Sequence, residues 1–236
     1  MQYKTELHVH TCEVSPCADL SVEEVTERYI AAGYTTLVLT NHYTSAVIDN
    51  AGQTWEEKIT HFLSGYRRMK EYAGERLHIL LGVELRFEEN ANDYLVYGAD
   101  EAFLISHPDL HKMTLKTFSS LSRANGLLLI QAHPFRNRMT VMNPKLLDGF
   151  EVFNGHCGTD SRNYLADAHA RRLGMIRTSG SDFHHADSVI GAGILTAEPI
   201  LSSEQLLNIL RGEDYGLICE GPVAEKSSMY TVPAKY

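Results

Sequence analysis

The segment Tyr-Lys-Thr-Glu-Leu-His-Val-His-Thr, residues 3–11, begins a strand that ends in two histidines. Polar and apolar side chains alternate over Tyr3–His10, which is the period of a β-strand. The same period places the imidazoles of His8 and His10 on one face of the strand. Two neighbouring imidazoles form half of a site for zinc, manganese or iron. A pair of exposed strand histidines is the alternative, and the rest of the chain decides between them.

Further along the chain, polar residues again follow short apolar runs that read as strands. These residues are His42 after Thr36–Thr40, Glu84 after His78–Leu81, His133 after Leu127–Ile130, and Asp182 with His184 after Met175–Thr178. A buried glutamate is costly unless it is paired or bound to a metal. Asp182 and His184 also repeat the spacing of the first histidine pair. Together these repetitions favour metal binding over packing.

Predicted strands alternate with predicted helices along the chain. The helices are Val22–Ala32, Trp55–Tyr72, Thr114–Asn125, Asn163–Leu173 and Ser203–Arg211, and the further strands are Tyr94–Tyr97, Phe150–Phe153 and Gly216–Cys219. This alternation indicates an α/β protein with a parallel sheet. A closed barrel and an open doubly wound sheet both fit the pattern. The polar strand ends can converge only if they share one rim, which a barrel supplies.

Composition limits the classes of function. The chain has 236 residues, of which 44% are hydrophobic and 22% charged, and we expect one soluble domain over residues 1–236. The net charge of -9 predicts no broad surface for nucleic acid. No apolar run approaches the roughly 20 residues of a membrane span. The four cysteines form no CxxC pair and residues 1–7 resemble no secretory signal, so we expect a cytoplasmic protein with free thiols.

The polar strand ends resemble the motifs of the PHP (polymerase and histidinol phosphatase) family. The matching motifs are His8-x-His10-Thr11, Asn41-His42, Gly82-Val83-Glu84, Ala132-His133-Pro134 and Ser181-Asp182-Phe183-His184. The resemblance runs from about Leu7 to His184. It implies a single-domain, distorted (β/α)7 TIM-like barrel with a dinuclear or trinuclear metal centre. It also implies a metal-dependent phosphoesterase.

The resemblance further implies a ligand set for two or three divalent ions, which are zinc, manganese or iron. The first ion is bound by His8, His10, Glu84 and Asp182. The second is bound by His42 and His184. Glu84 bridges the first ion to a third, which His133 helps to bind. The family's usual Thr-Asp-His motif reads Thr40-Asn41-His42 here, so a carboxylate is missing beside the site.

Two ligand positions stay open at this level. The family often has another ligand about six residues after the first motif, and Glu13 and Cys17 compete for that role. Glu13 is preferred, because an oxygen ligand suits a hard or borderline cation. The third site usually takes a histidine where this chain has Asp93. Asp93 therefore substitutes as a ligand, unless the third metal is weak or absent.

The predicted reaction is hydrolysis of a phosphate ester by a hydroxide that the metals activate, with a monoester preferred to a diester. His156 and His185 are candidates for the acid that protonates the leaving group. Arg136 follows the Ala-His-Pro motif, and its planar guanidinium suits phosphate. Asn154 ends a strand at the same rim and is a candidate substrate contact. We expect the substrate to be a small phosphorylated molecule.

Two alternatives keep the metals but change the function. The first is a binuclear amidohydrolase that acts on an amide or on a non-phosphate ester. Such barrels often carry a metal-bridging modified lysine, and no lysine of this chain follows a strand core, which favours the phosphoesterase. The second alternative is a PHP module that binds metal without catalysis. This chain keeps nearly all of the family's ligands, which argues against that alternative. The sequence indicates neither the substrate nor the oligomeric state.

Overall fold

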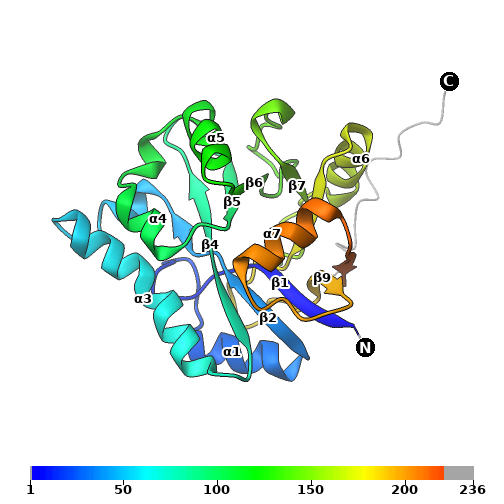
Figure 1. Cartoon of the computed structure of the whole chain (residues 1–236), viewed down its shortest axis with the longest axis horizontal. Coiled ribbons are helices and arrows are strands. Elements are labelled where there is room, and N and C mark those ends of the chain that lie inside the picture. Colours follow the sequence, from blue (N-terminus) through cyan, green and yellow to red (C-terminus); the bar gives the residue numbers. More distant parts are fainter. Residues whose placement is uncertain (1, 221–236) are drawn as a thin grey trace.

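The opening strand, β1 (Tyr3–Val9), lies between β9 and β2 in a strongly curved sheet in the computed structural model, which describes residues 2–220 (Figure 1). The strand order is β10-β9-β1-β2-β4-β5-β6-β7-β8, and β3 pairs with β4 off this path. The other strands are β2 (Tyr34–Leu39), β3 (His42–Tyr43), β4 (His78–Arg86), β5 (Asp93–Tyr97), β6 (Leu128–Gln131), β7 (Gly149–Asn154), β8 (Ile176–Gly180), β9 (Ala192–Thr196) and β10 (Gly216–Cys219). The expected domain extends to residue 236, and its part 221–236 lies outside the described residues.

The sheet curves until the chain after β8 meets the end of β1. Val9 forms an isolated parallel bridge with Phe183. The N–H of His10 donates to the carbonyl oxygen of Phe183 at 3.1 Å. Nearby, the N–H of Ser181 donates to Oε1 of Glu6 at 3.0 Å. The fold is therefore a nearly closed α/β barrel, and the prediction of a distorted barrel is confirmed.

The distortion comes mainly from β5, which runs antiparallel to both of its neighbours, β4 and β6. Only residues 87–92 separate Arg86, the last residue of β4, from Asp93, the first of β5. A parallel connection needs a crossover of a dozen or more residues, so this short link can only form a hairpin. Strands β9 and β10 are antiparallel as well. The sheet is thus mixed, where the alternation alone predicted parallel strands.

The predicted helices are present with small shifts at their ends. The helices are α1 (Val22–Ala31), α2 (Ser45–Ile48), α3 (Trp55–Ala73), α4 (Glu101–Ser106), α5 (Leu115–Ala124), α6 (Asn163–Leu173) and α7 (Ser203–Gly212). Ser21 and Thr54 begin α1 and α3 with capping boxes, in which Glu24 and Glu57 return the hydrogen bond. The short elements α2, β3, α4 and β9 are absent from the sequence prediction, and α2 and β3 contain too few residues to show a period.

Helix α7 differs from the peripheral helices, because it lies across the strands at the centre of the view in Figure 1. Its buried Leu206 and Leu210 belong to one apolar cluster with Leu7, Val38 and Leu80, which come from β1, β2 and β4. This cluster gives the sheet an apolar support close to His8. Among the described residues, no helix has both the length and the apolar character that a membrane span requires.

Candidate metal centre

The structure brings the polar strand ends together in three overlapping sets. In the first ligand group, His8, His10, Glu84 and Asp182 offer atoms that lie within 4.8 Å of one another. The same limit holds for the second ligand group, which is His10, His42 and His184, and for the third, which is Glu84, Asp93 and His133. All of these side chains except that of His42 are buried, although they are polar.

These groups form because several strands end at the same place. His8 lies in β1 and Glu84 near the end of β4, while His42 begins β3. His133 follows β6, and Asp182 follows β8. The register supports this, since His42 pairs directly with Glu84. Residues that are far apart in sequence therefore meet at one rim, as the barrel interpretation expects.

Local backbone geometry is unusual at three positions of the centre. His133 and Asp182 have positive φ angles of 29° and 51°. Such a conformation costs a non-glycine residue of order 1–3 kcal/mol and persists where its surroundings enforce it, as at functional sites. The register of β1 against β2 also shifts between Glu6 and Val9, and such a bulge redirects side chains. The rings of His8 and His10 nevertheless lie 5.1 Å apart, centre to centre.

Several of the ligand atoms point at one another without forming hydrogen bonds. Nε2 of His8 lies 3.2 Å from Oε1 of Glu84 and 3.3 Å from Oδ1 of Asp182. Nε2 of His10 and Nδ1 of His42 lie 3.2 Å and 2.7 Å from Oε2 of Glu84. Within residues 2–220, these three nitrogens and Oε2 of Glu84 have no hydrogen-bond partner. Such buried atoms cost about 1–3 kcal/mol each. Converging imidazole and carboxylate atoms fit divalent metal ions instead.

Opposite charges dominate the electrostatics of the centre. Burial alone would lower the pKa of His8, but the surrounding carboxylates, Asp182 first, raise it well above its usual value. Burial opposes the charge of His42 too, yet Glu84 raises the pKa of His42 to about 10. For Glu84 and Asp182 burial would raise the pKa, but His8 and other cationic neighbours hold the pKa of both well below the usual value. The centre therefore contains ionised carboxylates next to protonated imidazoles.

The third ligand group is partly engaged in another interaction. Arg86 donates two hydrogen bonds of 2.7 Å, from Nε and Nη2, to the two carboxylate oxygens of Asp93. Oδ2 of Asp93 lies 3.8 Å from Nε2 of His133, which is 3.3 Å from Oε1 of Glu84. Asp93 is thus in the place where the sequence predicts a substitute ligand, but its charge is shared with Arg86.

Glu13 and Cys17 are the two candidates for the ligand position after the first motif. The structure does not bring Glu13 to the ligand groups. Oε1 of Glu13 accepts a hydrogen bond from the N–H of Val22 at 3.0 Å and lies 3.4 Å from Arg68. Glu13 therefore caps the first turn of α1. Cys17, whose side chain is exposed, likewise belongs to none of the three ligand groups, so the structure brings neither candidate to them.

Arg136 and Asn154 lie beside Asp182. Nη2 of Arg136 donates to Oδ2 of Asp182 at 2.8 Å and to Oδ1 of Asn154 at 2.7 Å. Nδ2 of Asn154 also donates to Oδ2 of Asp182, at 3.2 Å. Both residues predicted to contact substrate are therefore at the centre, and both bind a carboxylate that belongs to the first ligand group.

The two candidate acids differ in their surroundings. His156 offers a nitrogen within 4.8 Å of ligand atoms of Asp182 and His184, and its Nδ1 is buried without a hydrogen bond among the described residues. Burial lowers the pKa of His156 below its usual value. His185 is more exposed, and its Nδ1 lies 2.7 Å from Oδ2 of Asp19. The structure thus places His156 at the centre and His185 at its edge.

Sequence reasoning misses two polar residues that support the ligands. Glu151, on β7, lies behind His8, with Oε1 2.8 Å from Nδ1 of that ring. The signal available for Glu151 was the same as for Glu84, namely a glutamate inside an apolar strand. Asn41 replaces the family's aspartate, and its Oδ1 accepts hydrogen bonds from the N–H of Thr11 and from Oγ of Ser15. It therefore braces the loop after β1 without a charge.

A separate cluster of possible ligands lies away from these groups. Asp49, Asp109 and His111 offer atoms within 4.8 Å of one another. Oδ1 of Asp49, however, lies 3.6 Å from Nζ of Lys58 and 3.5 Å from Nζ of Lys112. Lys112 also lies 3.1 Å from Asp109. Two ammonium groups balance the two carboxylates, so this cluster is a salt-bridge network.

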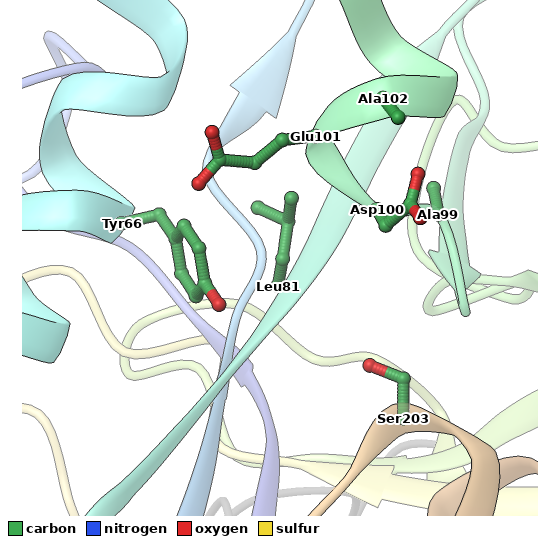
Figure 2. Close-up of a pocket in the computed structure, with 7 residues that line it drawn as sticks. All are labelled: Tyr66, Leu81, Ala99, Asp100, Glu101, Ala102 and Ser203. Carbon is green, nitrogen blue, oxygen red and sulfur yellow. The ribbon is translucent and has the colours of Figure 1, made fainter.

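A cavity of about 260 Å³ lies between α3, α4 and α7, and Figure 2 shows its lining. The lining residues are Tyr66, Leu81, Ala99, Asp100, Glu101, Ala102 and Ser203. None of them belongs to a ligand group. Arg67 donates to Glu101 at 2.6 Å, and Asp100 caps α4. The acidic side chains that line this cavity therefore already have partners within the fold, and the cavity contains no candidate metal ligand.

Gly180 gives a testable link between packing and the metal centre. A Cβ at this position would collide with Cβ of His8 and would lie 2.7 Å from Oε1 of Glu151. We expect Gly180→Ala to lower the free energy of unfolding by about 1–3 kcal/mol, because the barrel interior has no room to relax. Urea denaturation measures this. Gly212→Ala is the matched control, since nothing lies within 4 Å of its Cβ, and unchanged stability in Gly180→Ala would contradict the packing argument.

Comparison with known proteins agrees with this geometry. The PHP domain model matches residues 6–215. No curated protein matches the chain by sequence. The chain is similar to the structure of a two-domain protein from Bacteroides vulgatus that contains a predicted PHP-like metal-dependent phosphoesterase. The identity is 14% and the TM-score 0.67, over 93% of this chain and 65% of that one.

Two other solved structures share the fold. One is an amidohydrolase from Chromobacterium violaceum with bound sulfate, at 17% identity and a TM-score of 0.54, over 88% of this chain and 97% of that chain. The other is a lesion-specific endonuclease from Pyrococcus furiosus, at 12% identity and a TM-score of 0.60, over 92% of this chain and 58% of that chain. This chain thus spans less than two thirds of the Bacteroides and Pyrococcus proteins.

Proposed function

The chain belongs to the PHP domain family, and we propose that it hydrolyses a small phosphate monoester with two or three bound zinc, manganese or iron ions. One observation supports the proposal most directly. Buried imidazole and carboxylate atoms converge from separate strands, and several of them, including Nε2 of His8 and His10 and Oε2 of Glu84, have no hydrogen-bond partner among the described residues. Packing does not account for such an arrangement, because it leaves costly atoms unsatisfied.

The ligand groups assign residues to each ion. The first ion would be held by His8, His10, Glu84 and Asp182, and the second by His42 and His184, with His10 close to both ions. The third would be held by Glu84 and His133, with Asp93 shared between the ion and Arg86. Mixed nitrogen and oxygen donors of this kind suit zinc, manganese or iron. Because Arg86 competes for Asp93, we expect the third ion to bind most weakly.

The chain's own residues would bind substrate and move a proton. When bound, divalent ions acidify water and offset the charge of phosphoryl oxygens. Arg136 holds Asp182 through Nη2, and the same guanidinium has further N–H groups for a phosphate oxygen. Burial lowers the pKa of His156, so its ring is mainly neutral at pH 7 and would have to take up a second proton before it could protonate the leaving oxygen. His185 is the more exposed alternative donor.

Metal content and hydrolysis, measured together on one preparation, test the proposal. We expect two or more zinc, manganese or iron ions per chain, and hydrolysis of an aryl phosphate monoester that chelation abolishes. An aryl phosphodiester and an aryl amide, assayed in parallel, are expected to react more slowly. Faster cleavage of the diester would make the protein a diesterase, and faster cleavage of the amide would favour the amidohydrolase alternative. Failure to bind any of these metals would overturn the proposal.

A further inference from the structure

Glu151 is a fully buried carboxylate with both oxygens in use. Oε1 lies 2.8 Å from Nδ1 of His8. Oε2 accepts hydrogen bonds of 2.9 Å from the backbone N–H of His133 and from Nδ2 of Asn154. Glu151 itself belongs to none of the three ligand groups. It therefore touches the ligands of the proposed metals from behind.

The contact with His8 fixes which ring nitrogen can bind a metal. A carboxylate only accepts hydrogen bonds, so Nδ1 of His8 must carry a proton and donate it to Oε1 of Glu151. In a ring that has lost its other proton, Nε2 then carries the lone pair. Nε2 is the atom that faces Glu84 and Asp182, at 3.2 and 3.3 Å. Glu151 thus selects the tautomer that the first ligand group requires.

The second oxygen of Glu151 acts on another ligand group. The N–H that it accepts belongs to His133, whose φ of 29° lies in the left-handed region. This conformation is unfavourable for a histidine and needs a partner to hold it. The same oxygen accepts from Asn154, which in turn donates to Asp182. One carboxylate therefore connects a ligand of the first group with a ligand of the third.

The surroundings of Glu151 restrict the orientation of its carboxylate. The side chain is inaccessible to solvent. Gly180 lies against it so closely that a methyl group there would approach Oε1 to 2.7 Å. Because the carboxylate cannot turn towards water, its orientation is determined by His8, His133 and Asn154. The geometry is therefore pre-set before a metal arrives, which reduces the ordering needed on binding.

We propose that Glu151 is a positioning residue that orients His8 and His133 and so couples the first and third metal sites. The proposal rests on the proposed function, since it assumes that these histidines bind metal. Carboxylates behind metal-binding histidines typically contribute about 10–100-fold to metal affinity. Here one such carboxylate serves two sites, and both are expected to weaken when it is changed.

The test is Glu151→Gln with Zn²⁺ affinity as the readout, measured by competition with a chromophoric chelator. A glutamine keeps the size of the side chain but presents an amide N–H₂ to either the His8 ring or the His133 N–H. We expect Zn²⁺ affinity to fall about 10–100-fold, with loss of at least two bound ions together. Asp148→Asn is the matched control. It removes a carboxylate just before β7 that accepts the N–H of Leu129, and it touches no ligand.

A second readout separates positioning from mere stability. In metal-loaded protein with ¹⁵N-labelled histidine, NMR is expected to show His8 protonated at Nδ1 in the wild type and in Asp148→Asn, and a changed Nδ1 signal in Glu151→Gln. Wild-type Zn²⁺ affinity and an unchanged His8 signal in Glu151→Gln would overturn the positioning role alone. A wild type that binds no Zn²⁺ would overturn the proposed function as well. If Glu151→Gln does not fold, Glu151→Asp replaces it, since the shortened carboxylate cannot reach both partners and the same fall in affinity is expected.

Discussion

Asp182→Ala is expected to abolish phosphate-ester hydrolysis and to lower the number of bound metal ions. Oδ1 of Asp182 lies 3.3 Å from Nε2 of His8 and 3.4 Å from Nε2 of His10. Its Oδ2 accepts from Arg136. The substitution therefore removes a ligand and the anchor of Arg136 at once. Since a residue behind a ligand already contributes about 10–100-fold, we expect the loss of the ligand itself to exceed roughly 100-fold in activity.

The controls distinguish loss of the ligand from loss of the fold. Asp182→Asn keeps an oxygen for Arg136 but removes the charge, so it is expected to lose metal while unfolding at a urea concentration closer to that of the wild type. Asp187→Ala changes an exposed aspartate on the same loop and is expected to keep full activity. Metal content is measured by plasma emission, and activity with an aryl phosphate. Wild-type metal content and activity in Asp182→Ala would refute the role of Asp182.

The convergence of the candidate ligands could be predicted because their signal is local. Each of His42, Glu84 and His133 follows an apolar run, and a barrel needs no further information to bring such ends to one rim. The β5 hairpin was less predictable, because the signal for its direction is the length of residues 87–92 rather than any motif. The alternation of strands and helices along the chain carries no sign of this reversal.

The contacts of the residues that support the candidate ligands could not be read from the sequence. Glu151 meets His8 across 143 positions of the chain, and only the register of β7, β8 and β1 decides that contact. Glu13 shows the opposite error. Its side-chain chemistry suits a metal, but the first turn of α1 has unpaired N–H groups that Glu13 satisfies at Val22. A carboxylate at this position could either bind a metal or accept a hydrogen bond from the start of a helix, and its chemical type alone does not decide between these two roles.

Metal binding is expected to weaken steeply as pH falls, because the ions must displace protons. In the metal-free protein, the pKa of His42 is about 10 and the pKa of His8 is well above its usual value. Both groups are therefore protonated near pH 6.5, and each must lose a proton to bind a metal. The pKa values of Glu84 and Asp182 are well below normal, so these carboxylates are already ionised and release nothing.

The number of protons released on metal binding determines how strongly metal affinity depends on pH. His184 has a pKa of about 3, lowered first by burial and then by His10, and so it is already neutral and contributes no proton. Loading the first and second groups should release about two protons, one from His8 and one from His42. The affinity of each group then falls about tenfold for each unit by which pH decreases, and the product for both falls about 100-fold.

Calorimetry measures the proton count directly. Zn²⁺ is titrated into metal-free protein at pH 6.5 in buffers with different ionisation enthalpies, and the dependence of the observed heat on that enthalpy gives the number of protons released. His42→Gln should release about one proton fewer than the wild type, because the side chain that carried it is gone. His61→Gln, on the outer helix α3, should match the wild type. Metal binding without proton release would contradict the charged state that the carboxylates impose on His8 and His42.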